Sequence, residues 1–183
     1  MNVHYSIRPV LLQDMLRLQQ MSIATFSDAF AGQNKPEDMA HYLNQAFSID
    51  ALTNELNDTD SEFYFAEHAS TAVGYIKLNK CCTYAENHQL PAVELERIYV
   101  LQSFQKGGVG QILLNFALQW AKNQKAHTLC LGVWQHNAGA IRFYERNGFS
   151  RCGSHIYMLG TDPQTDLLMA RTLELFYQTY FAQ

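Results

Sequence analysis

A short glycine-rich turn that opens the most regular helix of the chain constrains the fold most strongly. It reads Gln105-Lys106-Gly107-Gly108-Val109-Gly110 and follows an apolar run at 93–100. Apolar residues at one-face helical spacing continue from the turn to about residue 125. In such a turn the backbone N–H groups converge on one point, and the helix N-terminus adds a partial positive charge. This arrangement favours a bound phosphate or pyrophosphate group.

The same turn excludes two common nucleotide-binding motifs. A P-loop requires Gly-Lys followed by Ser or Thr after four free positions, and the turn does not contain that sequence. A Rossmann fingerprint requires a third glycine at position 113, which is Leu113. From the residues alone, two interpretations of the turn stay open: a site for another phosphate-bearing ligand, or a plain helix cap.

Hydrophobic periodicity predicts a mixed α/β fold of the α+β class. We expect strands at 3–8, 62–66, 72–78, 93–100, 127–134, 151–159 and 165–172, and helices at 11–31, 36–47, 49–56, 107–125 and 137–147. The second half alternates strand and helix, so we expect a sheet covered by helices. The 183 residues suit a single domain over 1–183, with a helical region at 22–60 and an apolar-rich tail at 174–183. The tail is the contact surface of a regulatory interaction protein, a packed last helix or a dimer contact.

The net charge of −4 and the distribution of charges along the chain indicate which kinds of ligand the protein can bind. With 13 Lys and Arg against 17 Asp and Glu, a general nucleic-acid binder is disfavoured. No apolar run of about 18 residues occurs and residues 1–10 lack an apolar signal segment, so we expect neither a membrane span nor export. Residues 101–151 hold six basic residues and one acidic one, whereas 22–60 hold seven acidic and one basic. A basic half suits a polyanionic cofactor and an acidic region a cationic substrate, although solvated helix faces would give the same pattern.

The cysteines and histidines predict no metal or redox site. Cys81 and Cys82 are adjacent, Cys130 and Cys152 are isolated, and no C-x-x-C pair occurs. We therefore expect four unpaired thiols, as in a cytoplasmic protein. The seven histidines stand at no metal-binding spacing from one another.

A second informative segment runs from Asn137 to Phe149. Asn137 suits the N-cap position of the helix predicted there. Small and aromatic residues fall near one face of that helix, namely Ala140, Ile141, Tyr144 and Gly148. Small residues on such a face let a flat or backbone-like group approach. The alternative is an ordinary amphipathic helix with a half-buried tyrosine.

Together, the two segments resemble the GNAT superfamily of acyl-CoA-dependent N-acyltransferases. The family signature Arg/Gln-x-x-Gly-x-Gly/Ala is similar to the turn at 105–110, and the later segment Asn-x-x-Ala-x-x-Phe-Tyr-x-x-x-Gly-Phe is similar to 137–149. Further stretches resemble the bacterial PaiA-type spermidine/spermine N-acetyltransferases, namely 18–26, 96–100, 131–134 and 164–169. The resemblance covers most of the chain, from about residue 8 to residue 173.

The resemblance implies a GNAT fold and a site for acetyl-CoA, without a metal. The sheet would be mixed and mostly antiparallel, with about seven strands splayed between the fourth and fifth, and with helices on both faces. Acetyl-CoA would lie in the V between 93–100 and 127–134, with its pyrophosphate on the glycine turn and its pantetheine arm paired with the first of these strands. The implied cofactor-binding residues are Ile98, Tyr99, Val100, Gln105, Lys106, Gly107, Gly108, Val109, Gly110, Gln111, Asn137, Ala138, Gly139, Tyr144 and Arg146.

The implied reaction is acetyl transfer from a thioester to a primary amine. The amine must lose a proton, because a free amine has a pKa of about 10. Tyr144 is the expected general acid for the CoA sulfur, since its O–H is a hydrogen-bond donor at neutral pH.

The expected acid–base partner of the amine is Glu96. Glu96, Ile98 and Val100 alternate onto one face of the predicted strand, and Glu94 shares that parity. Glu96 would thus lie near the thioester, bind the cation and relay its proton through water. The alternative for both acids is an ion pair at the edge of the sheet, for instance with Arg97.

We expect the walls of the acceptor site at 22–60 and in the loop 80–92. The predicted substrate contacts are Asp28, Glu37, Asp38, Glu86 and Glu94, with Phe26, Phe30 and Tyr42 as aromatic walls. Separated carboxylates suit a polyamine such as spermidine or spermine, whose charges lie several methylenes apart. The alternatives are an acetyltransferase for another amine, either a small molecule or a protein N-terminus, and a non-catalytic CoA-binding sensor. A homodimer is compatible with each.

Overall fold

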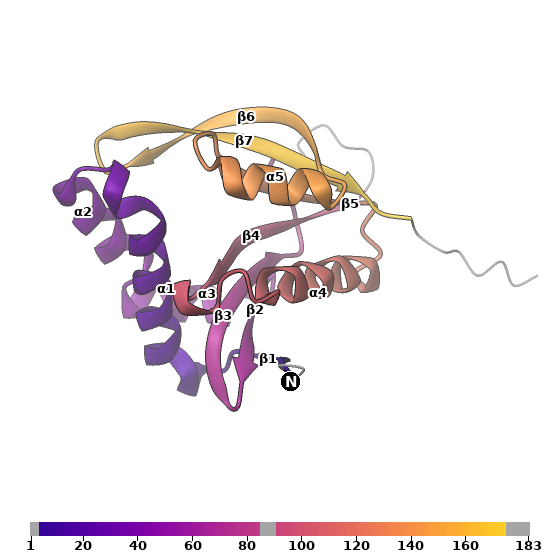
Figure 1. Ribbon diagram of the computed structural model, residues 1–183, viewed down its shortest axis with the longest axis horizontal. Coiled ribbons are helices and arrows are strands. Elements are labelled where there is room, and N and C mark those ends of the chain that lie inside the picture. Colours follow the sequence, from indigo (N-terminus) through magenta and orange to yellow (C-terminus); the bar gives the residue numbers. More distant parts are fainter. Residues whose placement is uncertain (1–3, 85–90, 175–183) are drawn as a thin grey trace, which may run out of the picture.

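The computed structural model describes residues 4–84 and 91–174 (Figure 1). Its strands are β1 (Ser6–Pro9), β2 (Ser61–His68), β3 (Thr71–Asn79), β4 (Ala92–Val100), β5 (Thr128–Trp134), β6 (Ser150–Leu159) and β7 (Asp162–Thr172). Its α-helices are α1 (Met15–Phe30), α2 (Pro36–Ala46), α3 (Ile49–Asn57), α4 (Val109–Asn123) and α5 (Ala138–Arg146). In the described part of the chain, no helix combines the length and apolar character needed to cross a membrane.

The seven strands form one sheet in the order β1-β2-β3-β4-β5-β7-β6. All neighbouring strands are antiparallel except β4 and β5, which are parallel. These two pair only where Ala92–Glu94 meet Thr128–Cys130, and then diverge. Figure 1 shows β4 running away from the layer of β5, β7 and β6. The predicted α+β fold, with its splay between the fourth and fifth strands, is confirmed.

Helices cover both faces of the sheet, as predicted. On one face α4 and α5 join a core cluster that includes Leu113, Leu114 and Tyr144. On the other face α1, α2 and α3 enclose a second cluster, which includes Leu18, Met39 and Leu52. The apolar stripe that predicted α4 is therefore the stripe that it buries. The acidic region 22–60 forms most of the helical layer on the second face.

The prediction of four unpaired thiols is wrong for one pair. Cys82 and Cys130 form a disulfide across 48 residues of sequence, whereas Cys81 and Cys152 are exposed and free. The backbone N–H of Cys82 donates to the carbonyl of Ala92, which lies beside β5 in the sheet. This long-range pairing of the segment after β3 with the start of β4 brings the two sulfurs together, and no local spacing could have revealed it.

A close contact fixes α2 against the turn between β6 and β7. The Asp38 carboxylate accepts hydrogen bonds from the backbone N–H of Thr161 at 2.7 Å and from its hydroxyl at 3.1 Å. These hydrogen bonds lower the pKa of Asp38, and the bond from the backbone N–H has the largest effect. Gly160 has φ +62°, and a Cβ there would lie 2.8 Å from the Asp38 Cα. Only glycine fits this approach without strain.

Replacing Gly160 with Ala should destabilise the fold by about 1–3 kcal/mol, because the new methyl group meets Asp38 and the left-handed backbone is strained. Urea denaturation would measure the loss. Gly32→Ala is the matched control, since a Cβ at that position meets nothing within 4 Å. Equal stabilities of the two variants would show that the close contact between Gly160 and Asp38 does not contribute to the packing of α2.

Candidate active site

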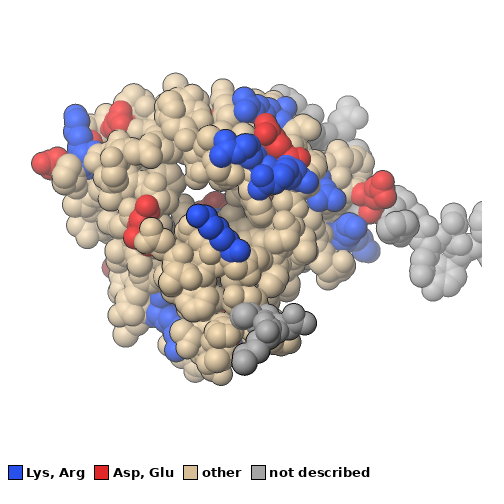
Figure 2. Space-filling model, viewed as in Figure 1, with Lys and Arg blue, Asp and Glu red and all other residues tan. Residues whose placement is uncertain are grey.

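The divergence of β4 and β5 creates an opening that two helices border. Gln111 near the start of α4 donates to the Asn147 side chain at 2.7 Å, and Asn147 donates back at 3.2 Å. This pair joins the glycine turn to the end of α5. Figure 2 shows a hollow on this face, with Lys and Arg side chains gathered where Figure 1 draws α5. The two sequence segments that carried the resemblance thus lie together at one rim.

The glycine turn presents unused backbone donors. Gly108 is the N-cap of α4, has φ +85° and provides no side-chain cap. The first N–H groups of a helix have no partner inside it, so those of α4 are available to an anion. A Cβ at Gly108 or at Gly110 would meet nothing within 4 Å, which means that the space before the helix is open. Gln105 and Lys106 are exposed beside it. These features fit a diphosphate.

The inner edge of β4 is open toward the V. On its other side the strand pairs with β3, through Ile76 with Ile98 and Gly74 with Val100. Beyond Glu94 it has no register partner in β5 among the described residues. The backbone between 95 and 100 therefore offers donors and acceptors to an extended ligand, as the resemblance implied for Ile98, Tyr99 and Val100.

The predicted N-cap of α5 is confirmed. Asn137 is its N-cap, and its side chain accepts from the N–H of Ala140 at 3.0 Å. Ala138 and Gly139 are exposed in the first turn, and Arg146 is exposed in the last. These positions leave the residues accessible from the side of the opening where Lys and Arg gather.

Tyr144 is buried on α5 between two aromatic rings. It is 6% exposed and its ring centroid lies 5.4 Å from that of Phe143 and 5.7 Å from that of Phe149. Burial raises the pKa of Tyr144. The phenol is therefore neutral at physiological pH and retains a proton to donate.

The expectation that Glu96, Ile98 and Val100 share one face is wrong. The β3–β4 register shifts between Lys77 and Leu78, so the alternation of β4 changes there. Ile98 and Val100 pack on the core under α4, whereas Glu96 contacts Lys77, which lies on the opposite face over Phe63. Counting alternate residues along a strand cannot reveal a β-bulge, and for this reason the prediction placed Glu96 on the wrong face.

Glu96 belongs to a network of buried charges. It lies 2.7 Å from the Lys77 ammonium and 3.2 Å from the Arg97 guanidinium, and Glu55 of α3 bonds both cations. Burial opposes its charge, but Arg97 and Lys77 outweigh burial, so the pKa of Glu96 is lowered. The alternative of an ion pair with Arg97 is thus observed, and Glu96 is a weak proton acceptor.

The pKa of Glu94 shifts in the opposite direction to that of Glu96, although both side chains contact Asn79. Glu94 is 3% exposed, and it accepts a hydrogen bond from the Asn79 side chain at 3.4 Å. Burial, followed by the charge of Glu96, raises the pKa of Glu94. A carboxylate in this state takes up a proton more readily than an ordinary one.

The other predicted substrate contacts are dispersed. Asp28 and Glu37 are exposed, and Asp38 is bonded to Thr161. Glu86 lies outside the described residues. The aromatic walls do assemble: Phe26 lies 4.5 Å from both Phe30 and Tyr42 between ring centroids.

One group of side chains on this face was not predicted to belong to the site. Trp134, Asp166 and His155 lie across β5, β7 and β6, and Tyr84 packs on His155 with ring centroids 4.9 Å apart. Only the strand register brings them together, so periodicity within each segment could not find them.

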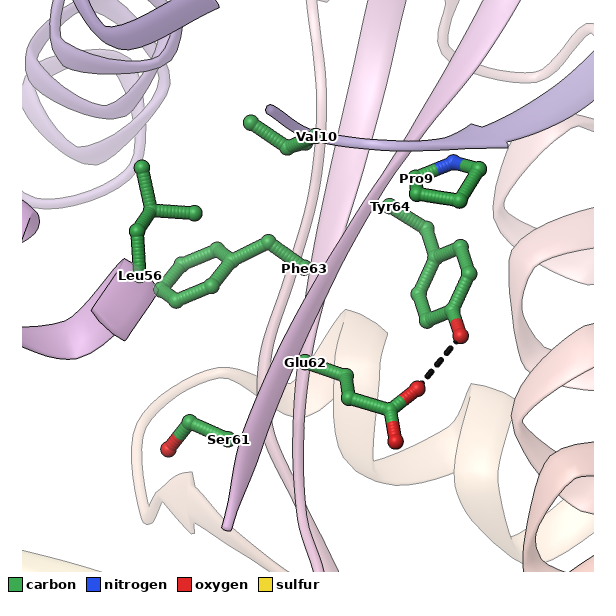
Figure 3. Close-up of a pocket in the computed structure, with 7 residues that line it drawn as sticks. All are labelled: Pro9, Val10, Leu56, Ser61, Glu62, Phe63 and Tyr64. Atoms are coloured by element: carbon green, nitrogen blue, oxygen red, sulfur yellow. Dashed lines mark hydrogen bonds between the residues drawn. The ribbon is translucent and has the colours of Figure 1, made fainter. Parts of the chain in front are cut away.

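A separate small pocket of about 150 Å³ lies along β2 (Figure 3). The strands β3 and β4 separate it from the opening. Its one carboxylate, Glu62, accepts from Tyr64 at 2.5 Å and from the Trp120 indole at 3.0 Å. Because these donors already satisfy Glu62, we assign the pocket no ligand.

Comparison with known proteins identifies the family. The acetyltransferase (GNAT) family matches residues 22–149. An uncharacterized N-acetyltransferase in the pepI 3′ region of Lactobacillus delbrueckii subsp. lactis is 37% identical, over 88% of this chain and 93% of that protein. A spermidine N(1)-acetyltransferase of Thermoplasma acidophilum is 25% identical, over 78% of this chain and 86% of that protein. The fold is similar to the crystal structure of the PaiA N-acetyltransferase from T. acidophilum in complex with coenzyme A, with a TM-score of 0.76 and 23% identity, over 92% of this chain and 99% of that one. The chain therefore belongs to the GNAT acetyltransferase family and is an N-acetyltransferase.

Proposed function

We propose that the protein transfers the acetyl group of acetyl-CoA to a primary amine of a polyamine such as spermidine. The observation that carries the proposal is the opening between β4 and β5, with free helix N–H groups at one rim and buried carboxylates on the face toward α1. The similarity to a spermidine N(1)-acetyltransferase supports the choice of polyamine. The alternatives of a protein N-terminus as acceptor and of a non-catalytic CoA sensor are outcomes of the assay below.

The donor would bind along the opening. The N–H groups at the start of α4 would hold the diphosphate, with Gln105, Lys106 and Gln111 beside it. The free edge of β4 at Ile98–Val100 would pair with the amide groups of the pantetheine arm, like an added strand. Asn137 to Gly139 and Arg146 on α5 would line the opposite side.

The acetyl transfer needs two proton movements. The amine nitrogen attacks the thioester carbonyl carbon, the C–N bond forms and the C–S bond breaks. We assign the proton lost by the amine to Glu94, directly or through one water, because its raised pKa favours the protonated form. Glu96 keeps its charge beside Lys77 and Arg97, which neutralise it, so we assign it no part in the proton transfer. Tyr144 would give its proton to the departing thiolate.

An assay of free thiol release across a panel of amines tests the proposal. We expect kcat/KM for spermidine and spermine at least about tenfold above that for simple monoamines, because a second charge can add more than about 1.4 kcal/mol of binding. Mass spectrometry of the product confirms monoacetylation. Rates on spermidine no higher than on monoamines would discard the polyamine. Acetylation of peptide N-termini alone would indicate a protein acceptor, and CoA binding without turnover would indicate a sensor.

A further inference from the structure

Three side chains stand in a row across β5, β7 and β6. The register pairs Trp134 with Asp166 and Asp166 with His155. Directly paired residues project from the same face of a sheet. Trp134 contacts Phe30 of α1, with ring centroids 5.8 Å apart, so the row faces the helical region 22–60. We propose that Asp166 binds a second ammonium group of the acceptor, an inference that rests on the proposed function.

Within residues 4–84 and 91–174, the Asp166 carboxylate forms no ion pair. Its Oδ1 is inaccessible to solvent and accepts no hydrogen bond in the part of the chain that the structure describes, and the same is true of Nδ1 of the neighbouring His155. Burial raises the pKa of Asp166, with partial opposition from His155. Asp166 is half-buried, but a carboxylate oxygen that is shielded from solvent and has no partner costs folding free energy, and a bound ammonium would offset that cost.

The neighbouring carboxylates of this face have partners. Asp38 accepts both hydrogen bonds of Thr161, and Glu55 and Glu96 are neutralised by Lys77 and Arg97. Asp162, which shares the face of Asp166 on β7, accepts a hydrogen bond from the Gln164 side chain. Glu94 lies on β4 at the opening, where the first amine reacts in the proposed function. Asp166 is therefore the carboxylate of this face best placed to hold a charge away from the reacting nitrogen.

The surroundings of Asp166 suit an ammonium group. Gly132 lies two residues before the β5 partner of Asp166, and a Cβ there would lie 3.3 Å from the Asp166 Oδ2 and 3.6 Å from the Tyr84 hydroxyl. Burial, followed by charges that include Glu94 and Asp166, raises the pKa of Tyr84 to about 12, which keeps its ring neutral. Aromatic faces beside a carboxylate are a favourable environment for organic cations.

The backbone register places Asp166 farther along the sheet than Glu94. Glu94 pairs with Cys130, and Asp166 pairs with Trp134, four residues further along β5. The Asp166 Oδ2 itself lies beside Gly132, between these two levels. An acceptor whose first amine reacts at Glu94 therefore needs a second ammonium group a few methylenes away to meet Asp166.

The test compares Asp166→Asn with Asp50→Asn, which removes an exposed carboxylate on α3. Calorimetry of spermidine with the CoA-saturated protein measures binding, and kcat/KM is measured with spermidine and with butylamine, which has no second charge. For Asp166→Asn we expect spermidine binding and kcat/KM to fall at least about 30-fold, because one partner of a desolvated charge pair is lost. Butylamine should change by less than about twofold, and Asp50→Asn should match the wild type for both amines.

The melting temperature is a second readout. Asn replaces Asp166 without a change of size and removes an uncompensated charge, so the variant should melt no lower than the wild type. A lower melting temperature, or an equal loss with both amines, would overturn the inference in favour of a structural role. If the wild type prefers spermidine and Asp166→Asn keeps that preference, only this inference fails. If the wild type shows no such preference, the polyamine function fails and the inference fails with it.

Discussion

Replacing Gly110 with Glu should abolish binding of coenzyme A while leaving the fold as stable as the wild type or more stable. A Cβ at Gly110 meets nothing within 4 Å, so the larger side chain enters open space at the first turn of α4. Glycine inside a helix costs about 1 kcal/mol relative to good helix formers, and a carboxylate near a helix N-terminus is favourable. The same carboxylate would occupy the anion site itself.

The expected loss is large because two like charges would meet. Placing a carboxylate where the diphosphate should lie costs several kcal/mol, so the dissociation constant of coenzyme A should rise at least about 100-fold. Calorimetric titration measures the change. Gln119→Glu adds the same charge at an exposed position later in α4 and should bind as the wild type does. Full binding by Gly110→Glu would mean that the glycine turn only caps its helix.

The sequence predicts most of the fold because the fold follows from local patterns. The stripe of α4 and the alternation of β2 and β3 each depend on neighbours within a few residues. The glycine turn and the Asn137 cap were also visible, since both are local backbone requirements. The splay came from the family resemblance, because no residue pattern states where two parallel strands part.

The acceptor side was predicted less well because it is made by long-range pairing. Asp38 was expected to contact substrate, but it bonds Thr161, 123 residues away. The bulge in β4 separated Glu96 from Ile98, and parity counting cannot detect a bulge. Asp166 lies in the stretch 164–169 that carries part of the resemblance, but no role was predicted for it, because its neighbours come from two other strands.

The donor side and the acceptor side of the opening differ in their charge distribution. On the donor side, exposed cations and free N–H groups suit a polyanion that must bind and leave. On the acceptor side, the charges of Lys77, Arg97, Glu55 and Glu96 cancel within one network. Glu94 and Asp166 lie outside that network, and both have raised pKa values, with burial as the largest cause in each case. This separation favours an amine that arrives as a cation and must lose a proton.

Replacing Tyr144 with Phe should lower kcat by roughly 10²–10⁴-fold, the usual effect of losing a general acid. The departing thiolate would leave without a proton from the phenol, whose raised pKa keeps that proton available in the wild type. The ring remains, and its contacts with Phe143 and Phe149 are aromatic, so packing should persist. Stopped-flow measurement of thiol release at saturating acetyl-CoA and amine gives kcat, and calorimetry should find coenzyme A binding unchanged.

The matched control for this variant is Tyr64→Phe. Its hydroxyl bonds Glu62 in the pocket along β2, which β3 and β4 separate from the opening, so kcat should equal that of the wild type. A series of acetyl thioesters sharpens the result. A variant that lacks the general acid should regain rate with thioesters whose thiolates are better leaving groups, because these thiolates need no proton to depart. An unchanged kcat for Tyr144→Phe would remove Tyr144 from the proton transfer and leave the thiolate to depart on its own modest basicity.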